Sequence, residues 1–70
     1  MKIMISIGSA IRERRKLLGI NQRMLAELSG VGVNVVTRIE RGESNTSTKV
    51  LEKVLETLGM ELSATVKNVK

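Results

Sequence analysis

The chain has 70 residues and a formal net charge of +5 at pH 7, with twelve Lys and Arg against seven acidic residues. It contains no His, Cys or Asp, so the usual transition-metal sites and the common catalytic triads cannot be built from it. We therefore expect one small domain that is not an enzyme and holds no metal or cofactor. Because a chain of this length buries only a modest core, a dimer would help to stabilise it.

The first element in chain order is an N-terminal segment, residues 1–6. Ile3, Ile5 and Ile7 alternate loosely, which is compatible with a short strand or a frayed arm, and the sequence does not choose between them. The apolar run is too short to span a bilayer and only Lys2 precedes it, so we expect neither a membrane segment nor a signal peptide. With the absence of cysteine, this predicts a cytoplasmic protein.

A first helix is predicted over residues 7–18. Ser6 is placed to cap it, and Gly19 ends it. Its apolar positions recur at helical spacing and should face the core: Ile7, Ala10, Ile11, Leu17 and Leu18.

Two short helices joined by a tight turn are predicted between Gln22 and Ile39. Asn21 can cap the first of them, and Gly30 suits the left-handed residue that ends it. Leu25 and Leu28 form one apolar stripe; Val36 and Ile39 form another. Small Ala26, a glycine four residues later and apolar anchors on the next helix indicate a helix-turn-helix.

A polar loop at residues 43–46 leads into a fourth helix. Thr46 or Ser47 caps this helix, which is predicted to run over residues 48–58 and to end before Gly59. Its buried face is expected to consist of Leu51, Val54, Leu55 and Leu58.

The period then changes from helical to alternating. Met60, Leu62, Ala64 and Val66 alternate with polar residues, which predicts a strand over residues 60–67 with one buried face. Its partner is either the segment around Ile3–Ile7 or the same strand of a second subunit.

Charge is distributed unevenly along the chain. Residues 1–41 carry eight basic and three acidic residues, whereas residues 42–70 carry four of each. The excess positive charge therefore lies in the half that contains the helix-turn-helix. A polyanionic partner is the natural interpretation, and a solvated basic surface is the alternative.

This order of elements resembles the Cro and phage-repressor type, or Xre-like, helix-turn-helix regulators. The likeness covers residues 7–58 without a gap and rests on Ile11-Arg12-Glu13, Arg15-Lys16, Gly19-Ile20-Asn21-Gln22, Leu25-Ala26, Gly30-Val31 and Arg38-Ile39-Glu40-Arg41-Gly42. The tail at residues 58–67 is similar to that of the HipB-type antitoxins. The resemblance implies an all-α, phage-repressor-like domain of four to five helices, whose C-terminal β-strand pairs across a dimer.

The resemblance also implies roles for individual residues. Residues expected to read DNA bases are Gln22, Val33, Asn34, Thr37 and Arg38. Residues suited by chemistry to phosphate contacts are Asn21, Arg23, Asn45, Thr46 and Thr48. The pair Arg15 and Glu40 is expected to be structural, and dimerisation is assigned to Met60, Leu62, Ala64 and Val66.

The chemistry of three base-reading candidates agrees with that role. Asn34 can bond an adenine edge, Arg38 a guanine edge or a phosphate, and Val33 can meet a thymine methyl group. The alternative is that Asn34 caps the helix and Arg38 is a solvated charge. Gly32 departs from the family pattern, in which Ser or Thr often caps the third helix, so that helix should begin less firmly.

These observations predict a sequence-specific transcriptional repressor that binds a palindromic duplex operator as a homodimer. The tail favours the antitoxin of a HipBA-type operon, with a HipA-type kinase toxin as partner and no membrane partner. A stand-alone phage or restriction-system regulator is the alternative with the same fold. An adaptor whose helix-turn-helix binds protein is the alternative of another class.

Overall fold

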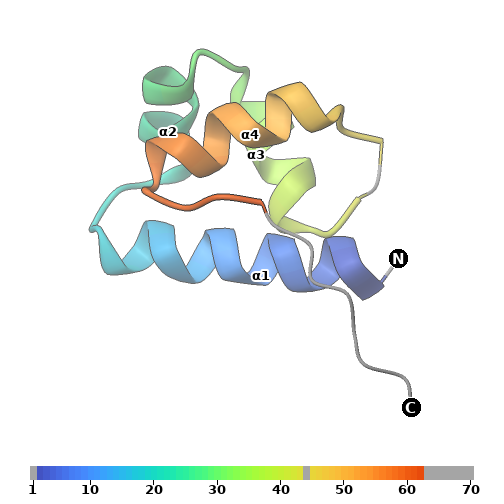
Figure 1. Ribbon diagram of the computed structural model, residues 1–70. Helices are drawn as coiled ribbons and strands as arrows, with labels where there is room; N and C mark the ends of the chain where they lie inside the picture. Colours follow the sequence, from blue (N-terminus) through green and yellow to red (C-terminus); the bar gives the residue numbers. More distant parts are fainter. Residues whose placement is uncertain (1, 44, 63–70) are drawn as a thin grey trace.

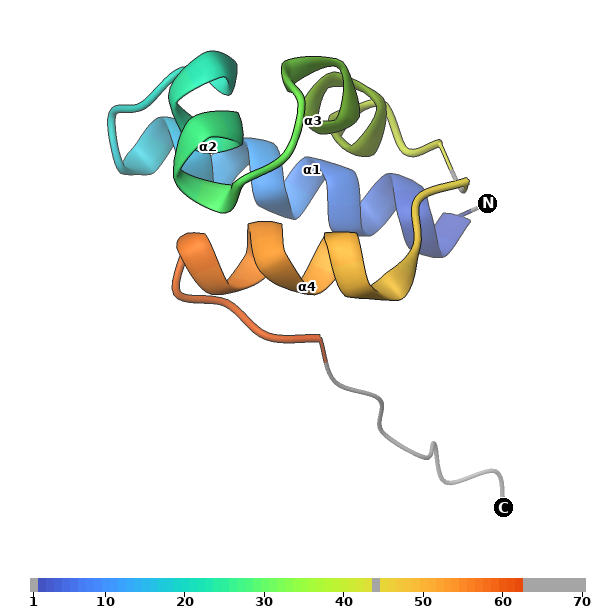
Figure 2. The same cartoon turned by 90° about the horizontal axis from the view of Figure 1, so that it is seen from above.

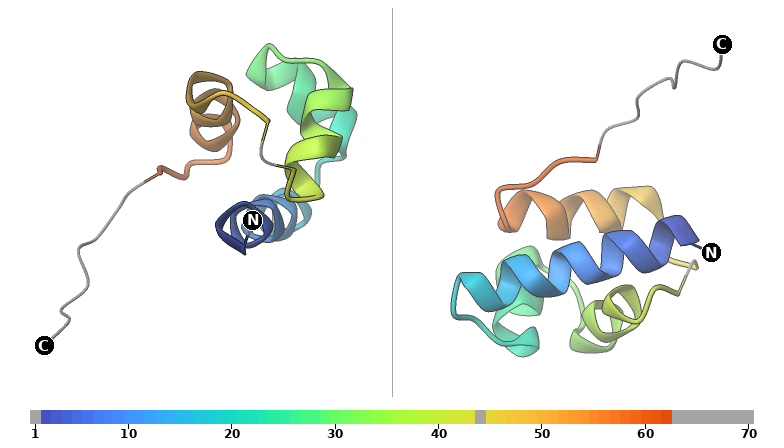
Figure 3. Two further views of the ribbon diagram at one scale, coloured as in Figure 1. Left: turned by 90° about the vertical axis from the view of Figure 1, so that its right-hand side faces the viewer. Right: turned by 90° about the horizontal axis from the view of Figure 1, so that it is seen from below.

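The computed structural model describes residues 2–43 and 45–62, and over these residues the fold is all-α. Four helices follow one another: α1 (Lys2–Leu17), α2 (Gln22–Ser29), α3 (Val33–Glu40) and α4 (Thr48–Thr57). Helix α1 runs along one edge of the molecule, and the other three pack above it (Figure 1). Figures 2 and 3 show α2 and α3 together on one side and α4 on the other.

The N-terminal segment is helical from Lys2 onwards, which corrects the expectation of a strand or frayed arm. Helix α1 already begins at Lys2, so Ser6 lies inside the helix and does not cap it. The reason is tertiary: the backbone of Ile5 approaches Gly42, and Gly8 lies against the carbonyl oxygen of Ile39. The first half of α1 is thus held against the C-terminal end of α3, and pairing of residues 3–7 with a strand is excluded.

The core is entirely aliphatic. Its buried hydrophobic residues are Ile11, Leu25, Ala26, Val36, Ile39, Leu51, Val54, Leu55 and Leu58. The predicted buried faces of α3 and α4 are therefore correct. Every helix contributes at least one of these side chains, so the four helices enclose one common core.

Several side chains expected in the core lie outside it. Leu17 is 76% exposed and Leu28 63% exposed, and Ala10 and Leu18 are also exposed. Ile11 is fully buried and Ile7 packs partly buried against the core, as predicted, but the other buried positions of α1 are Gly8 and Arg15. Positions 8, 11 and 15 recur at helical spacing. Because one of these is a glycine and another an arginine, the apolar pattern alone misses two buried positions and assigns Ala10, Leu17 and Leu18 wrongly to the core.

Local capping follows the sequence closely. The side chain of Asn21 accepts a hydrogen bond from the Met24 amide at 2.8 Å, and that of Ser47 accepts one from the Val50 amide at 3.2 Å. Gly30 adopts φ 73°, which turns the chain between α2 and α3. Gly32 precedes α3 and supplies no side-chain cap, as expected.

The chain beyond α4 turns back at Gly59 and leaves the described region at residue 62. The Met60 amide donates to the carbonyl oxygen of Leu55 at 2.8 Å, and Arg14 Nε donates to that of Leu58 at 2.9 Å. Residues 60–62 are not in a strand. The rest of the predicted strand, with Ala64 and Val66, lies outside the described residues.

Candidate nucleic-acid interface

Helices α2 and α3 form a helix-turn-helix whose inner surfaces are fixed by the core. Leu25 and Ala26 of α2 and Val36 and Ile39 of α3 are all buried in the same cluster. The turn between the helices is closed by a hydrogen bond of 3.0 Å from the Val31 amide to the carbonyl oxygen of Ala26. The outer side chains of α3 are therefore presented at a defined angle to those of α2.

The N-terminal ends of both helices face solvent. Val33 is 42% exposed, and Asn34 beside it is also exposed. Asn21 and Arg23, which flank the start of α2, are exposed as well. These are the positions from which a helix-turn-helix can approach base edges and phosphates.

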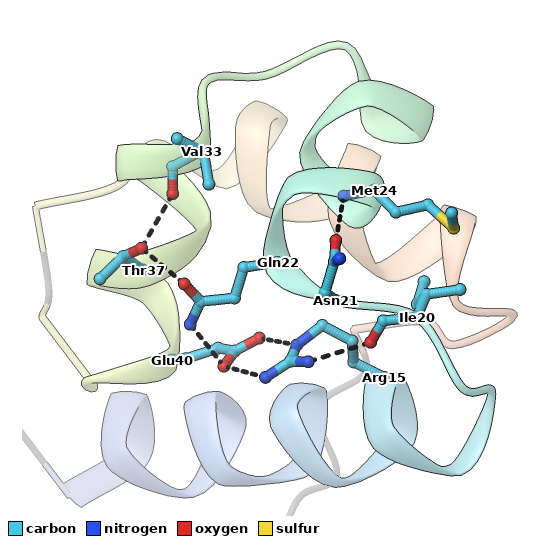
Figure 4. Close-up of polar contacts among 8 residues, drawn as sticks. All are labelled: Arg15, Ile20, Asn21, Gln22, Met24, Val33, Thr37 and Glu40. Carbon is cyan, nitrogen blue, oxygen red and sulfur yellow. Dashed lines mark hydrogen bonds and ion pairs between the residues drawn. The ribbon is translucent and has the colours of Figure 1, made fainter.

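A buried ion pair joins α1 to the end of α3. Arg15 Nε lies 2.6 Å from Glu40 Oε2, and Arg15 Nη2 donates to Glu40 Oε1 at 3.0 Å. The two side chains are only 10% and 4% exposed. Arg15 Nη1 also donates to the carbonyl oxygen of Ile20 at 3.0 Å, so the guanidinium ties together α1, the start of the helix-turn-helix and α3 (Figure 4).

The environment of Glu40 favours its charged form. Burial by itself would raise the pKa of Glu40, but hydrogen bonds from Arg15 and Gln22 and the charges of Arg15 and Arg12 lower the pKa below its ordinary value. The hydrogen bond with Glu40 raises the pKa of Arg15 in turn. Both partners are therefore ionised at neutral pH.

Gln22 extends this pair to the outer face of α3. Its Nε2 donates to Glu40 Oε1 at 3.0 Å, and its Oε1 accepts from the Thr37 hydroxyl at 2.8 Å. Thr37 also lies 3.0 Å from the carbonyl oxygen of Val33 (Figure 4). Two residues predicted to read DNA thus contact each other, and the Gln22 amide group is directed into the protein. Sequence reasoning missed this link, because no local pattern relates side chains on two helices.

The two remaining readout candidates differ in their surroundings. No side-chain hydrogen bond caps α3, so Asn34 does not serve as its cap. The Nε atom of Arg38 is buried and finds no hydrogen-bond partner among the described residues. Arg38 as a whole is partly exposed, so a base-reading role and a solvated charge both remain open for it.

The loop before α4 supplies the other candidates for phosphate contact. Asn45 and Thr48 are exposed and Thr46 is partly exposed, on either side of the capping residue Ser47. Near the start of this loop, Arg41 and Glu43 form an exposed ion pair of 3.6 Å. Arg23 and Arg38 form no ion pair within the described ranges.

Comparison with known proteins identifies the family. A sequence model described as helix-turn-helix matches residues 11–64, well over half of the chain. The chain belongs to the helix-turn-helix family of transcriptional regulators. The predicted Xre-like family is thereby confirmed, and with it the general class of helix-turn-helix transcriptional regulator. Proteins of this family typically bind DNA without catalysis, in agreement with the prediction that the chain is not an enzyme.

Relatives of this regulator include longer proteins. It is 43% identical over 56 residues to an uncharacterized HTH-type transcriptional regulator of Haemophilus influenzae, which covers 80% of this chain and 57% of that protein. It is 34% identical over 56 residues to the HTH-type transcriptional regulator PuuR of Escherichia coli, with 80% of this chain and 30% of PuuR covered. The chain thus spans little more than half of the first relative and under a third of the second.

Solved structures confirm the helix-turn-helix fold. The restriction-modification controller protein C.AhdI from Aeromonas hydrophila matches with a TM-score of 0.78 and 33% identity, over 87% of this chain and 92% of that one. The clp gene regulator ClgR from Corynebacterium glutamicum matches with a TM-score of 0.73 and 33% identity, over 83% and 62% of the two chains. The narrower likeness to HipB-type antitoxins is not addressed by these relatives.

The described part of the regulator contains neither a membrane-spanning helix nor a cluster of metal-binding residues. None of its described helices is long and apolar enough to cross a membrane. The described glutamates, which are the only potential metal ligands among the residue types His, Cys, Asp and Glu in this chain, form no group of three that could hold a metal ion.

Proposed function

We propose that this regulator is a sequence-specific repressor that binds a palindromic duplex operator as a dimer. The observation that carries the proposal is the shared exposure of the N-terminal ends of α2 and α3 on a helix-turn-helix that a buried ion pair locks to α1. An α-helix fits the major groove of B-DNA, where each base pair presents a distinct pattern of donors and acceptors. Helix α3 is the recognition helix in this proposal.

The exposed side chains divide between base and phosphate contacts. Asn34 suits an adenine edge, Arg38 a guanine edge or phosphate, and Val33 a thymine methyl group. Gln22 and Thr37 lie beside them, joined by their hydrogen bond. The phosphate-contact candidates are Asn21, Arg23, Asn45, Thr46 and Thr48. Because phosphate contacts release counterions, affinity should fall steeply as salt rises.

The test is a comparison of base-reading and phosphate-contact variants on a selected operator. Asn34→Ala and Arg38→Ala should each lose about 1–3 kcal/mol of preference for the operator over altered bases. Arg23→Ala should weaken binding to all sequences about equally. Lys53→Ala, which removes an exposed charge from α4, is the matched control and should change neither quantity. If Arg38→Ala keeps both affinity and base preference, the recognition face has been placed wrongly.

Dimerisation is assigned to the C-terminal residues 60–67, which follow a DNA-binding domain that ends at Leu58. Met60 packs on the core and Leu62 is exposed, and with Ala64 and Val66 they make the alternating apolar row. A strand that pairs with its two-fold copy satisfies backbone groups that an isolated edge leaves open. Two recognition helices would then enter major grooves roughly 34 Å apart.

Truncation after Gly59 tests this assignment. The shortened protein should keep most of its helical signal, sediment as a monomer and bind the operator far more weakly, since one half-site offers one recognition helix. Sedimentation of both chains at tens of micromolar gives the answer. A full-length protein that is monomeric under these conditions contradicts the strand exchange.

The partner assignment is an antitoxin role in a HipBA-type operon, with autorepression and binding of a HipA-type kinase toxin. The likeness of residues 58–67 to HipB-type antitoxins supports it. A stand-alone phage or restriction-system regulator is the second candidate, since the C.AhdI controller matches over most of both chains. The neighbouring gene discriminates between the antitoxin and the stand-alone regulator. If its product is a kinase, co-expression of the two proteins should yield a complex. Failure of the regulator to bind random DNA in a mobility-shift assay at any salt would favour a protein-binding adaptor.

A further inference from the structure

A chain of hydrogen bonds runs from Arg15 through Glu40 and Gln22 to Thr37, and the direction of each bond in it is fixed. Arg15 can only donate, and the ionised carboxylate of Glu40 can only accept. Glu40 Oε1 receives Arg15 Nη2 and one amide atom of Gln22, each at 3.0 Å. That amide atom must be the nitrogen Nε2, since two acceptor oxygens would repel. The amide oxygen of Gln22 is consequently turned towards Thr37.

This direction limits the hydroxyl proton of Thr37 to acceptors within the protein. Gln22 Oε1 is 2.8 Å from Thr37 Oγ1 and can only accept, so the hydroxyl donates to it. The other neighbour of the hydroxyl, the carbonyl oxygen of Val33 at 3.0 Å, is also only an acceptor. Thr37 has a single proton and two acceptors within the protein. Whichever of them takes the proton, none is left for a partner outside.

The same result holds if the Gln22 amide is reversed. The amide oxygen would then face Glu40, which requires a protonated carboxyl group. Nε2 would donate to Thr37, and the hydroxyl would donate to Val33 instead. In both arrangements the Thr37 hydroxyl has a free lone pair but donates its only proton within the protein. Its position on the partly exposed face of α3, one helical turn after Val33, makes that lone pair available to DNA.

We propose that Thr37 determines specificity as a hydrogen-bond acceptor, and that it reads the exocyclic amino group of adenine or cytosine. In the major groove, N6 of adenine and N4 of cytosine are the donors, whereas guanine and thymine present acceptors at the corresponding positions. An acceptor held against another acceptor loses its hydration without compensation. Gln22 is the positioning residue, because its amide group forms a hydrogen bond with the Thr37 hydroxyl. This inference rests on the proposed function, in which α3 lies in the major groove.

The experiment starts with selection of bound duplexes from random DNA by the wild-type protein and by Thr37→Val and Thr37→Ser. The base position whose preference changes in Thr37→Val is the position that Thr37 reads. We expect wild type to prefer adenine or cytosine there by about five- to tenfold over guanine or thymine. Thr37→Ser, which keeps the hydroxyl, should retain this preference. Thr37→Val should lose it at this position only, with unchanged helical content.

Base analogues make the test independent of whether the variants fold. The selected adenine is replaced by unsubstituted purine, or the selected cytosine by 2-pyrimidinone, each of which lacks the amino group. Wild type should bind the analogue operator about five- to tenfold more weakly, and Thr37→Val should show no further loss. Preference for guanine or thymine at this position, equal wild-type binding to the analogue, or a Thr37→Val effect that is absent or spread over all positions overturns the inference. A wild-type protein that selects no sequence overturns the proposed function together with it.

Discussion

Loss of the Glu40 carboxylate should remove a large part of the stability of this domain. Glu40→Ala deprives three donors of their acceptor: Nε and Nη2 of Arg15, and Nε2 of Gln22. The guanidinium of Arg15 would remain buried as an uncompensated charge, because only the carbonyl oxygen of Ile20 would still accept from it. Removal of one partner is the most destabilising change in a buried ion pair, since the remaining charge stays desolvated without an opposite charge to attract it.

The structure sets the size of the effect. The side chains of the pair are 10% and 4% exposed, so the cost for breaking a buried pair applies, about 3–5 kcal/mol. A domain of this size is stabilised by on the order of 4–10 kcal/mol in total. At about 4–8 °C per kcal/mol, the melting temperature should fall by at least roughly 12 °C. Operator affinity should fall as a consequence.

Far-ultraviolet circular dichroism is the appropriate measurement, because the chain contains no aromatic residue that could report by fluorescence. The matched control is Glu43→Ala, which removes the same charge from the Arg41–Glu43 pair, whose side chains are 68% and 40% exposed. That control should cost no more than about 1 kcal/mol. A double replacement of Arg15 and Glu40 by apolar residues of similar volume should recover part of the loss. Equal melting temperatures for Glu40→Ala and Glu43→Ala would refute the reasoning.

Three further predictions concern acid, packing and capping. Because the folded-state pKa of Glu40 is lowered, its contribution to the free energy of unfolding is fully present above the ordinary glutamate pKa of about 4.3 and is lost as pH falls through the lowered value. The melting temperature of Glu40→Gln should therefore decline less in acid than that of wild type. Equal declines would contradict this. Gly8→Ala gains about 1 kcal/mol of helix propensity, but the new Cβ meets the backbone carbonyl oxygens of Ile39 and Glu40, at a cost of about 1–3 kcal/mol. Thermal unfolding should therefore show a net loss of stability, in contrast to the exposed control Ser9→Ala. Gly32→Ser should stabilise the start of α3 by only a few tenths of a kcal/mol. It should also weaken operator binding in a mobility-shift assay, since a Cβ added at position 32 would lie 2.6 Å from Asn34 Oδ1 and displace that side chain. Undiminished binding would show that the present position of the Asn34 side chain is not needed.

The part of the fold that sequence predicts well is the part encoded locally. Asn21 and Ser47 cap the helices they precede, and Gly30 turns the chain, because each acts on backbone groups within a few residues. The paired apolar anchors Val36 and Ile39 identify the inner face of α3 for the same reason. These signals are sufficient to predict the helix-turn-helix and the family from the sequence.

The part that sequence predicts poorly depends on contacts distant along the chain. The helical state of the segment around Ile5 depends on its backbone contact with Gly42, which no pattern in residues 1–6 shows. The buried face of α1 includes Gly8 and Arg15, neither of which an apolar pattern would select. The same pattern assigns Leu17 to the core, although its side chain is exposed to solvent. Arg15 is accepted in the interior only because Glu40 faces it.

The candidate site divides in the same way. Exposure of Val33 and Asn34 follows from the helical period once α3 is placed. The orientation of Gln22 does not, because it depends on the meeting of its side chain with Glu40 and Thr37 across two helices. Residue types at the right register therefore identify a recognition surface, whereas the direction of each hydrogen bond on it requires coordinates.

The water-exposed leucines offer a way to separate the functions of this small protein. Leu17 and Leu28 contribute little to the core and are not among the candidate DNA contacts. Substitutions at such surface positions usually change the free energy of unfolding by no more than about 0.5 kcal/mol. Leu17→Lys and Leu28→Glu together leave the net charge unchanged and should make concentrated solutions easier to prepare. If either leucine contacts a protein partner, the doubly substituted chain would lose that partner while its affinity for DNA stays unchanged, and the two kinds of binding could then be studied separately.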